Sequence, residues 1–389
     1  MITMQIAGIH YTEFQSCSVE KTLDNLCGSF NFTAITSPDH IFPFRLGDEC
    51  KIYAEGELIL TGFIEIMDGQ GSAGQQTLTI SGRDKTCDVV DSTIGKNIEY
   101  HAGISLVEVI KQTLSKQGIT GIDVINNVKG LDNFTTGEIV TSQKSQSVFD
   151  FIESYARKRQ VLLTSTPEGN ILITRAATQL ETDVLVAREY FDINGRNNVL
   201  STSWNLDATN RFNTYIFSSQ HNVSVANVYG STESKKMISE DSKAVDNEIR
   251  PTRVYNGITE SSSDNVTCKN RASWEASLRI ARAITYNVTV PEYRHDPNDP
   301  QSTLWKLNTL VSIVDDYADI NSDMLVNNIT YTTDVNEGRL THLSFVVPEA
   351  YTLQEKIDAA NQRTKKKGKK VAAQFNYNKF YPDATDVSQ

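Results

Sequence analysis

A glycine-rich stretch is the first feature of the sequence that could support chemistry. Gly69, Gly71 and Gly74 give the pattern Gly-x-Gly-x-x-Gly within Asp68–Gln76 (DGQGSAGQQ), directly after a strand-like segment. A dinucleotide-binding loop of this pattern opens a helix, because the amides at the helix N-terminus hold the pyrophosphate. Residues 76–81 (QTLTIS) alternate between polar and apolar instead, which indicates a strand. We therefore expect a hairpin loop whose glycines supply positive φ and flexibility, and no cofactor site.

Two acidic segments could hold a metal ion or an acid–base pair. Asp84, Asp88 and Asp91 lie around Cys87, but their segment follows a strand directly and lacks the glycine-centred spacing of a calcium loop. We interpret it as a solvated turn with caps at Asp84 and Asp91. The segment 294–302 (RHDPNDPQS) contains two Asp-Pro steps, which favour a stiff irregular loop rather than a metal site.

The sequence contains no other enzyme motif. Its six histidines are scattered, and none lies four residues from another, so no helical zinc pair is expected. A Gly-x-Ser-x-Gly elbow and a Walker loop are both missing. The five cysteines are odd in number and include no Cys-x-x-Cys pair, which argues against a disulfide framework or a zinc site. We expect no catalytic, cofactor-binding or metal-binding residues, and no enzymatic activity.

Length and composition predict a globular protein of several domains. The 389 residues correspond to about two to four domains, and a hydrophobic content of 39% is enough for packed cores. The apolar runs are far shorter than the ~20 residues that span a bilayer, so no stable membrane insertion is expected. The N-terminal segment lacks the features of a signal peptide, which predicts a soluble protein made in a cytoplasm.

A cluster of lysines near the C-terminus contrasts with an otherwise acidic chain. The net charge is −11, yet the segment from Arg363 onward has seven basic and two acidic residues, which leaves 30 basic and 46 acidic residues before it. An acidic body argues against binding to duplex DNA, since such a surface must neutralise phosphates. The cluster could contact an acidic protein or nucleic acid, or remain a solvated tail. The candidate partner-binding residues are Lys365, Lys366, Lys367, Lys369 and Lys370.

Hydrophobic periodicity divides the chain into four segments. Residues 1–95 alternate with period 2 and predict a small antiparallel β-barrel or sandwich. Residues 96–180 predict an α+β module of helices and a hairpin that turns at residues 167–170. Its two expected helices share a serine N-cap with an acidic residue three positions later, Ser105 with Glu108 and Ser147 with Asp150.

The second half of the chain returns to extended patterning. Residues 181–350 predict a second β domain, with a helix–strand module inserted around residues 220–290. The helix of that module has apolar residues on one face, at Trp274, Leu278, Ala281 and Ile284. Residues 351–389 predict a C-terminal helix followed by the basic tail.

The last β segment repeats the pattern of the first. Leu46-Gly47-Asp48 before Cys50 and Ile52 is similar to Leu307-Asn308-Thr309 before Val311 and Ile313. Three further matches share an offset of 265 residues: Ile64 with Ile329, Leu78 with Leu343, and Ile80 with Phe345. We therefore predict a mainly β protein of the α+β class, with two similar small antiparallel β-barrel domains and α+β modules between them.

The order of these motifs resembles the baseplate hub proteins of contractile-tailed, Mu-like phages and prophages. The resemblance covers roughly residues 1–350. It is carried by LGDECKIYAEGELILTGFIE (46–65), SGRDKTCDVVDST (81–93), SVFDFIESYARKRQVLLTSTPEGNILITRA (147–176), WEASLRIARA (274–283), and LWKLNTLVSI, LVNNITY and LTHLSFVVPEAY (304–351). The lysine-rich end does not map onto the family pattern.

The resemblance implies a structural protein of the virion tail baseplate, assembled in the bacterial cytoplasm. It implies a homotrimer in which two similar barrels per chain form a pseudo-sixfold ring. Such a ring would join the sixfold tail tube protein to the threefold central spike protein and form a pore through which DNA passes. Two alternatives stay open at this point: a tail-associated cell-wall hydrolase, and a spike-type component of a contractile secretion system.

Overall fold

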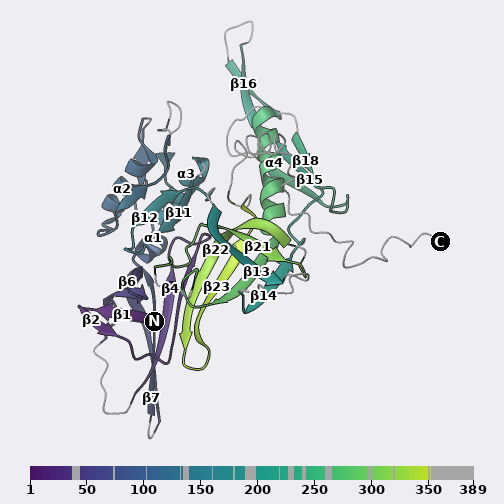
Figure 1. Ribbon diagram of the computed structural model, residues 1–389. Coiled ribbons are helices and arrows are strands. Elements are labelled where there is room, and N and C mark those ends of the chain that lie inside the picture. Colours follow the sequence, from purple (N-terminus) through teal and green to yellow (C-terminus); the bar gives the residue numbers. More distant parts are fainter. Residues whose placement is uncertain are drawn as a thin grey trace, which may run out of the picture. The chain divides into compact units, whose positions relative to one another are not determined.

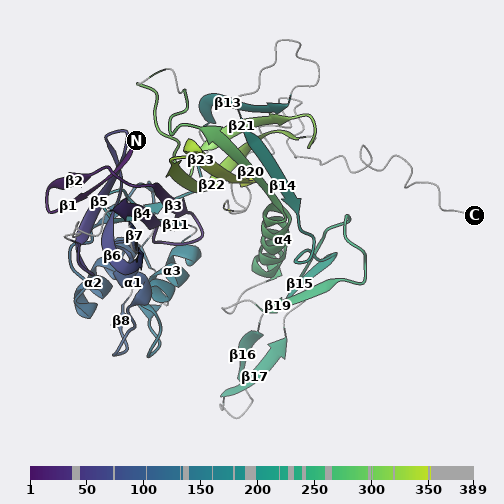
Figure 2. The same cartoon turned by 90° about the horizontal axis from the view of Figure 1, so that it is seen from below.

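The computed structural model (Figures 1 and 2) describes most of the chain up to residue 351. The residues outside the description are 37–43, 73–74, 102, 132, 135–139, 160, 178–179, 189–198, 219, 227–231, 239–241, 259–264, 297–298, 300, 319, 349–350 and 352–389. The chain forms two compact units. Unit 1 comprises Met1–Thr202, Asn287–Tyr317 and Leu325–Phe345, and unit 2 comprises Ser203–Tyr286, Ala318–Met324 and the described residues after Phe345.

The main sheet has 13 strands in the order β14-β20-β23-β22-β3-β4-β7-β6-β5-β1-β2, while β21 pairs with β22 and β13 pairs with β21. The strand bounds are β1 (Ile2–Ile6), β2 (Ile9–Tyr11), β3 (Ser16–Thr22), β4 (Ser29–Thr36), β5 (Glu49–Ala54), β6 (Glu57–Ser72), β7 (Gln75–Asp84), β13 (Leu180–Arg188), β14 (Ser201–Leu206), β20 (Ile284–Pro291), β21 (Leu310–Asp315), β22 (Ile320–Asp334) and β23 (Gly338–Val346). In Figure 1 the long hairpins β6–β7 and β22–β23 both extend downward.

Period-2 burial explains why these segments form strands. In β5, Cys50, Ile52 and Ala54 are fully buried while the residues between them are more exposed, as the sequence pattern predicts. The protein is mainly β with antiparallel sheets, which confirms the predicted class. The strand pairing of the described residues contains no closed barrel, so the prediction of two barrels is not confirmed.

Two sets of strands in this sheet follow the same order. The first repeat consists of β3, β4, β7, β6 and β5, and the second repeat consists of β14, β20, β23, β22 and β21. Gly47 donates its N–H to the carbonyl of Ile64 (2.7 Å), and Asn308 donates to the carbonyl of Val326 in the same way (3.0 Å). Gly47 and Asn308 also share a left-handed backbone, with φ of 87° and 61°. The predicted match of Gly47 with Asn308 is therefore confirmed.

The predicted match of Ile64 with Ile329, at an offset of 265 residues, is wrong. The hydrogen bonds align Ile64 with Val326, which lies three residues before the expected Ile329. Both Val326 and Ile329 are buried, at 0% and 1% exposure, so an apolar pattern alone could not distinguish them.

The glycine-rich stretch also differs from the prediction. Gly69 and Gly71 lie within β6, opposite Leu78 and Gln76 of β7, rather than in a loop. Neither has a positive φ. Strand β6 continues through Gly69 and Gly71 because glycine can adopt an extended backbone as other residues do. Gly74 lies outside the described residues.

The module after the first repeat contains three helices and two small sheets. Its elements are α1 (Cys87–Asp91), β8 (Glu99–Tyr100), α2 (Leu106–Gln117), β9 (Val124–Asn126), β10 (Val140–Thr141), α3 (Val148–Lys158), β11 (Leu162–Ser165) and β12 (Ile171–Thr174). Figure 2 shows the helices grouped below β6 and β7. The N-caps Ser105 and Ser147 each accept a bond from the backbone three residues later, as predicted. Helix α2 ends at Gly118, whose φ is 74°.

Unit 2 contains a sheet in the order β18-β15-β19, a separate hairpin β16–β17 and the helix α4. The bounds are β15 (Thr214–Ser218), β16 (Gln220–Ala226), β17 (Thr232–Ile238), β18 (Ser242–Val245), β19 (Val254–Ile258) and α4 (Asn265–Arg282). Ala272 and Ala276 of α4 form a core with Tyr215 and Phe217 of β15. Ile284 was expected on the helix but begins β20. No helix in the described part of the chain is long and apolar enough to cross a membrane.

Candidate functional site: the junction between the repeats

The predicted partner-binding lysines, Lys365 to Lys370, lie outside the described residues. Within the described residues, no group of three or more His, Cys, Asp or Glu side chains is arranged to hold a metal ion. In unit 1, converging polar side chains form two clusters, one close to the strand junction between the two repeats and one at the end of β7, and in unit 2 Arg211 pairs with Asp246 and Glu248.

The junction between the repeats is an antiparallel pairing of β22 with β3. Asn328–Asp334 of β22 lie opposite Ser16–Thr22 of β3, with Asn328 facing Thr22. Asn327 accepts hydrogen bonds from the backbone of Leu23 (2.8 Å) and the hydroxyl of Thr22 (3.1 Å). The two repeats thus form one continuous sheet through backbone hydrogen bonds.

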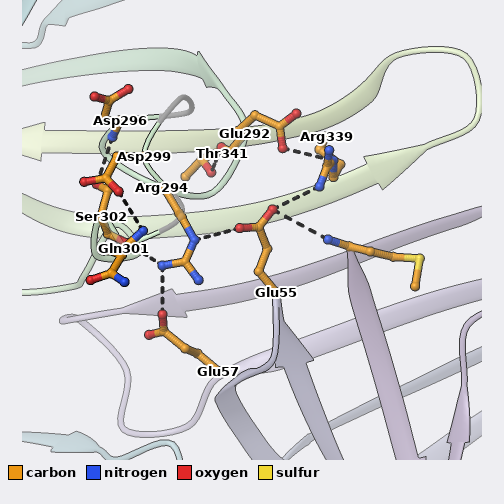
Figure 3. Close-up of polar contacts among 11 residues, drawn as sticks. Glu55, Glu57, Glu292, Arg294, Asp296, Asp299, Gln301, Ser302, Arg339 and Thr341 are labelled. Carbon is orange, nitrogen blue, oxygen red and sulfur yellow. Dashed lines mark hydrogen bonds and ion pairs between the residues drawn. The ribbon is translucent and has the colours of Figure 1, made fainter.

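An ion-pair cluster also joins the first and last β segments of unit 1 (Figure 3). Glu55, in the turn between β5 and β6, lies between two arginines. Its carboxylate is 2.7 Å from Nε of Arg294 and 2.9 Å from Nη1 of Arg339. Arg294 also pairs with Glu57 (2.9 Å), and Arg339 with Glu292 (2.9 Å). The pairs made by Glu55 and Glu57 join positions 237 or more residues apart in the sequence.

Arg294 is the central cation of this cluster. Its side chain is 12% exposed, and that of Glu55 is 23% exposed. Burial lowers the pKa of Arg294, but hydrogen bonds to Glu55 and Glu57 outweigh this effect and raise the pKa above its ordinary value. Because charge-assisted bonds strengthen away from solvent, the cluster is suited to fixing the geometry between the first and last β segments.

The loop that carries Arg294 is held by its own hydrogen bonds. The backbone of Asp296 donates to the hydroxyl of Ser302 (3.0 Å), and the backbone of Gln301 donates to the carboxylate of Asp299 (2.8 Å). Figure 3 shows these residues beside Arg294. Asp299 therefore caps a backbone amide of the loop with its carboxylate, as expected for an irregular loop.

A second polar cluster surrounds Asp84 at the end of β7. Its carboxylate accepts bonds from the backbone of Gly28 (2.8 Å), from both the backbone (2.9 Å) and hydroxyl (2.5 Å) of Thr86, and from the hydroxyl of Ser165 (2.6 Å). Asp84 is fully buried, so the predicted solvated turn is wrong at this position. Four hydrogen bonds make its burial tolerable, and they connect β7 to α1 and to the β11 strand.

Asp84 does cap the backbone of Thr86, as predicted, but Asp91 does not act as the predicted cap. It is the last residue of α1 and pairs with Arg83, which also contacts Glu65 at 2.7 Å. The hydrogen bond from Arg83 lowers the pKa of the Asp91 carboxyl. Both clusters are structural joints. The sequence offered no signal for the pairing of Arg294 and Arg339 with Glu55 and Glu57, because these partners lie 237 or more residues away.

Comparisons with known proteins agree in pointing to one group. Family models match for the N-terminal domain of Mu phage baseplate assembly protein GpP-like proteins (residues 1–84), the second domain of baseplate hub protein gp44-like proteins (86–175) and the fourth domain of Mu phage baseplate assembly protein GpP (264–354). Together these models match about two thirds of the chain.

Individual relatives extend over nearly the whole chain. The baseplate hub protein gp44 of Escherichia phage Mu is 24% identical over 364 residues, which are 93% of this chain and 92% of that protein. The 43 kDa tail protein of prophage MuSo2 from Shewanella oneidensis has a similar fold, with a TM-score of 0.74, 22% identity, and coverage of 91% of this chain and 99% of that chain. A component of the type VI secretion system of E. coli has a TM-score of 0.52 and 10% identity, covering 90% of this chain and 78% of its own.

Proposed function

Because the chain belongs to the family of baseplate hub and tail proteins of Mu-like phages and prophages, we propose that it forms a homotrimeric hub. As a phage baseplate protein it is a component of the virion tail. The proposed hub joins a sixfold tail tube protein to a threefold central spike protein, and encloses a pore through which DNA passes. Its role is structural and requires no catalytic site.

The repeated strand order is the observation that carries this proposal. A sixfold ring and a threefold ring cannot share one set of identical contacts unless the component between them has both symmetries. Each chain has two repeats with the same strand order, so three chains present six similar β units. The threefold partner then contacts the three chains, while the sixfold partner contacts the six repeats.

The acidic composition supports a pore for DNA. The residues before Arg363 carry 46 acidic and 30 basic side chains. Acidic side chains around a channel repel phosphates, so that DNA slides through instead of binding to the wall. An assembled hub with a neutral or basic channel would contradict this part of the proposal.

The fold alone also fits a spike-type component of a contractile secretion system. The E. coli secretion-system protein is covered over 78% of its length, whereas the Mu hub protein is covered over 92%. The higher coverage of the Mu hub protein favours the hub. A tail-associated cell-wall hydrolase has no support in the geometry of the described residues, and zymography on peptidoglycan tests it directly.

The mass of the protein in solution tests the proposal. The chain has a mass of 43.4 kDa, so a trimer has a mass of about 130 kDa. We expect a stable trimer by light scattering at micromolar concentration. A clean monomer over this range would refute the homotrimeric hub.

A further inference from the structure

The strand β22 shows how one strand edge serves two neighbours. Near its middle, Val326 exchanges backbone hydrogen bonds with Asn308 and Thr309, which lead into β21. Beyond that point, Asn328–Asp334 pair with β3 of the first repeat. One edge of β22 is therefore occupied along its length, first by β21 and then by β3.

The equivalent strand β6 has only the first of these neighbours. Ile64 exchanges backbone hydrogen bonds with Gly47 and Asp48, which lead into β5. Residues 66–71, which correspond to the part of β22 that pairs with β3, are paired only with β7 in the part of the chain that the structure describes. Ile66 is 56% exposed there. A strand edge of this length is a template for another strand.

The repeat identifies the strand that would fit this edge. In the second repeat, β14 occupies the place that β3 has in the first. Gln15, before β3, donates to the carbonyl of Thr33 (2.8 Å), and Leu200, before β14, donates to Thr289 in the same way (2.8 Å). The two strands then begin alike, with Ser-Cys-Ser in β3 and Ser-Thr-Ser in β14.

The surface of β14 is unusual for a strand of a large sheet. All six of its residues are exposed, and they include Trp204 (38%) and Leu206 (36%). The strand also terminates the order of the sheet. Exposed apolar residues on a terminal strand are typical of a surface that another chain covers.

We propose that residues 66–71 of β6 pair antiparallel with β14 of a second copy of the chain, in the register that β22 and β3 adopt within one chain. This inference rests on the proposed homotrimer and adds the contact that forms it. The expected opposed pairs, with the second copy named last, are Asp68 with Asn205, Gly69 with Trp204, Gln70 with Ser203, and Gly71 with Thr202.

The proposed register gives Gly69 and Gly71 a role. A Cβ added at either residue would meet no described atom within 4 Å, and neither residue needs a positive φ. In contrast, a Cβ at Gly82 of the same hairpin would lie 1.9 Å from the carbonyl of Phe63. The chain's own packing therefore requires Gly82 but does not require Gly69, whereas the side chain of Trp204 from a second copy would need the space that Gly69 leaves.

This contact is head-to-tail, because β6 and β14 are different surfaces. Head-to-tail contacts produce closed rings or open filaments. Three copies would close a ring with two kinds of junction in alternation: β22 with β3 within each chain, and β6 with β14 between neighbouring chains. Both junctions would have the same strand register. Such a ring is what the repeats of the proposed hub require.

Site-directed crosslinking tests the register. Two tagged forms of the chain are co-expressed, one with Gln70→Cys and the other with Ser203→Cys. Directly opposed side chains have Cβ atoms about 4.5–5.5 Å apart, close enough for a disulfide after small adjustment. We expect a covalent heterodimer on a non-reducing gel. Thr202→Cys in place of Ser203→Cys is the matched control, because adjacent residues in a strand point to opposite faces, and we expect at least tenfold less product.

A glycine variant provides a second readout. Gly69→Trp should weaken the trimer by more than tenfold, while Gly95→Trp should not, although both glycines are exposed and have open space around them. Thermal unfolding checks that both variants fold. A stable trimer without the specific crosslink, or with equal effects of the two glycine variants, overturns this inference and leaves the homotrimer intact. A monomeric wild type overturns both.

Discussion

The ion pairs of Arg294 give the sharpest quantitative test of the structure. The change Arg294→Met keeps most of the apolar stem but removes the guanidinium, which contacts Glu55 at 2.7 Å and Glu57 at 2.9 Å. It therefore breaks two contacts between the first and last β segments without opening a large cavity.

The two contacts differ in their expected strength. The Glu55 side chain is 23% exposed, and a charge-assisted bond of this kind is worth about 1.5–3 kcal/mol. The Glu57 side chain is 47% exposed, and solvent reduces its contribution to about 0.2–1 kcal/mol. Glu55 retains Arg339 at 2.9 Å, so it is not left as a lone buried charge. We expect Arg294→Met to lower the free energy of unfolding of this region by about 2–3 kcal/mol.

Urea unfolding followed by tryptophan fluorescence measures this change, because Trp305 stacks on His295, next to Arg294 (ring centroids 3.9 Å apart). Arg157→Met is the matched control, since Arg157 pairs with Glu153 on an exposed face of α3, where such a pair contributes about 0.3–0.5 kcal/mol. A double-mutant cycle with Glu55→Gln isolates the pair itself. If Arg294→Met costs no more than the control, or if the coupling to Glu55 is below about 0.5 kcal/mol, our reasoning about the cluster is wrong.

Three further outcomes follow from the structure. Asp84→Asn should destabilise the protein by about 2–4 kcal/mol, because the buried carboxylate accepts four hydrogen bonds and the amide accepts fewer. Asp88→Asn, at an exposed position, should change the stability little. Thermal unfolding compares the two variants. Gly82→Ala should prevent folding or shift Tm strongly, because its Cβ would overlap a carbonyl of the adjacent strand; circular dichroism would reveal a native fold if this is mistaken. Burial raises the pKa of Cys50 to about 12, and of Cys87 to about 12. Because the folded thiols hold their protons more tightly than the unfolded ones, stability should fall as pH rises from about 9 towards 12. Neither thiol should react with iodoacetamide at pH 8 until urea is added. Peptide mapping identifies the labelled cysteines, and labelling of Cys50 or Cys87 in the folded protein would contradict their burial.

Local signals predicted the local structure well. The serine caps at Ser105 and Ser147 located the first residues of both helices, because capping depends on neighbours along the chain. Period-2 alternation likewise located β5, where Cys50 and Ile52 are buried as their spacing predicts. These features are set by residues within one or two turns of each other, which the sequence shows directly.

Long-range features were not predictable in the same way. The burial of Asp84 depends on Ser165, which lies 81 residues away, and nothing near Asp84 indicates this contact. The register of the repeats was misjudged at Ile64 because Val326 and Ile329 are both buried. The atoms that join the two repeats come from pairings that no local pattern encodes.

The pairing of β3 with β22 has a consequence for the newly made chain. Thr22 leaves the ribosome 305 residues before Asn327, with which it bonds in the folded protein. At about 5–20 residues per second, β3 waits roughly 15–60 s for its neighbour. During this time its edge is open to strands of other nascent chains, including the β22 of a neighbouring polysome product. The charged residues Glu20 and Lys21 on this strand would limit such mispairing. The sequence of β3 must therefore disfavour pairing with strands of other chains and still allow pairing with its own β22.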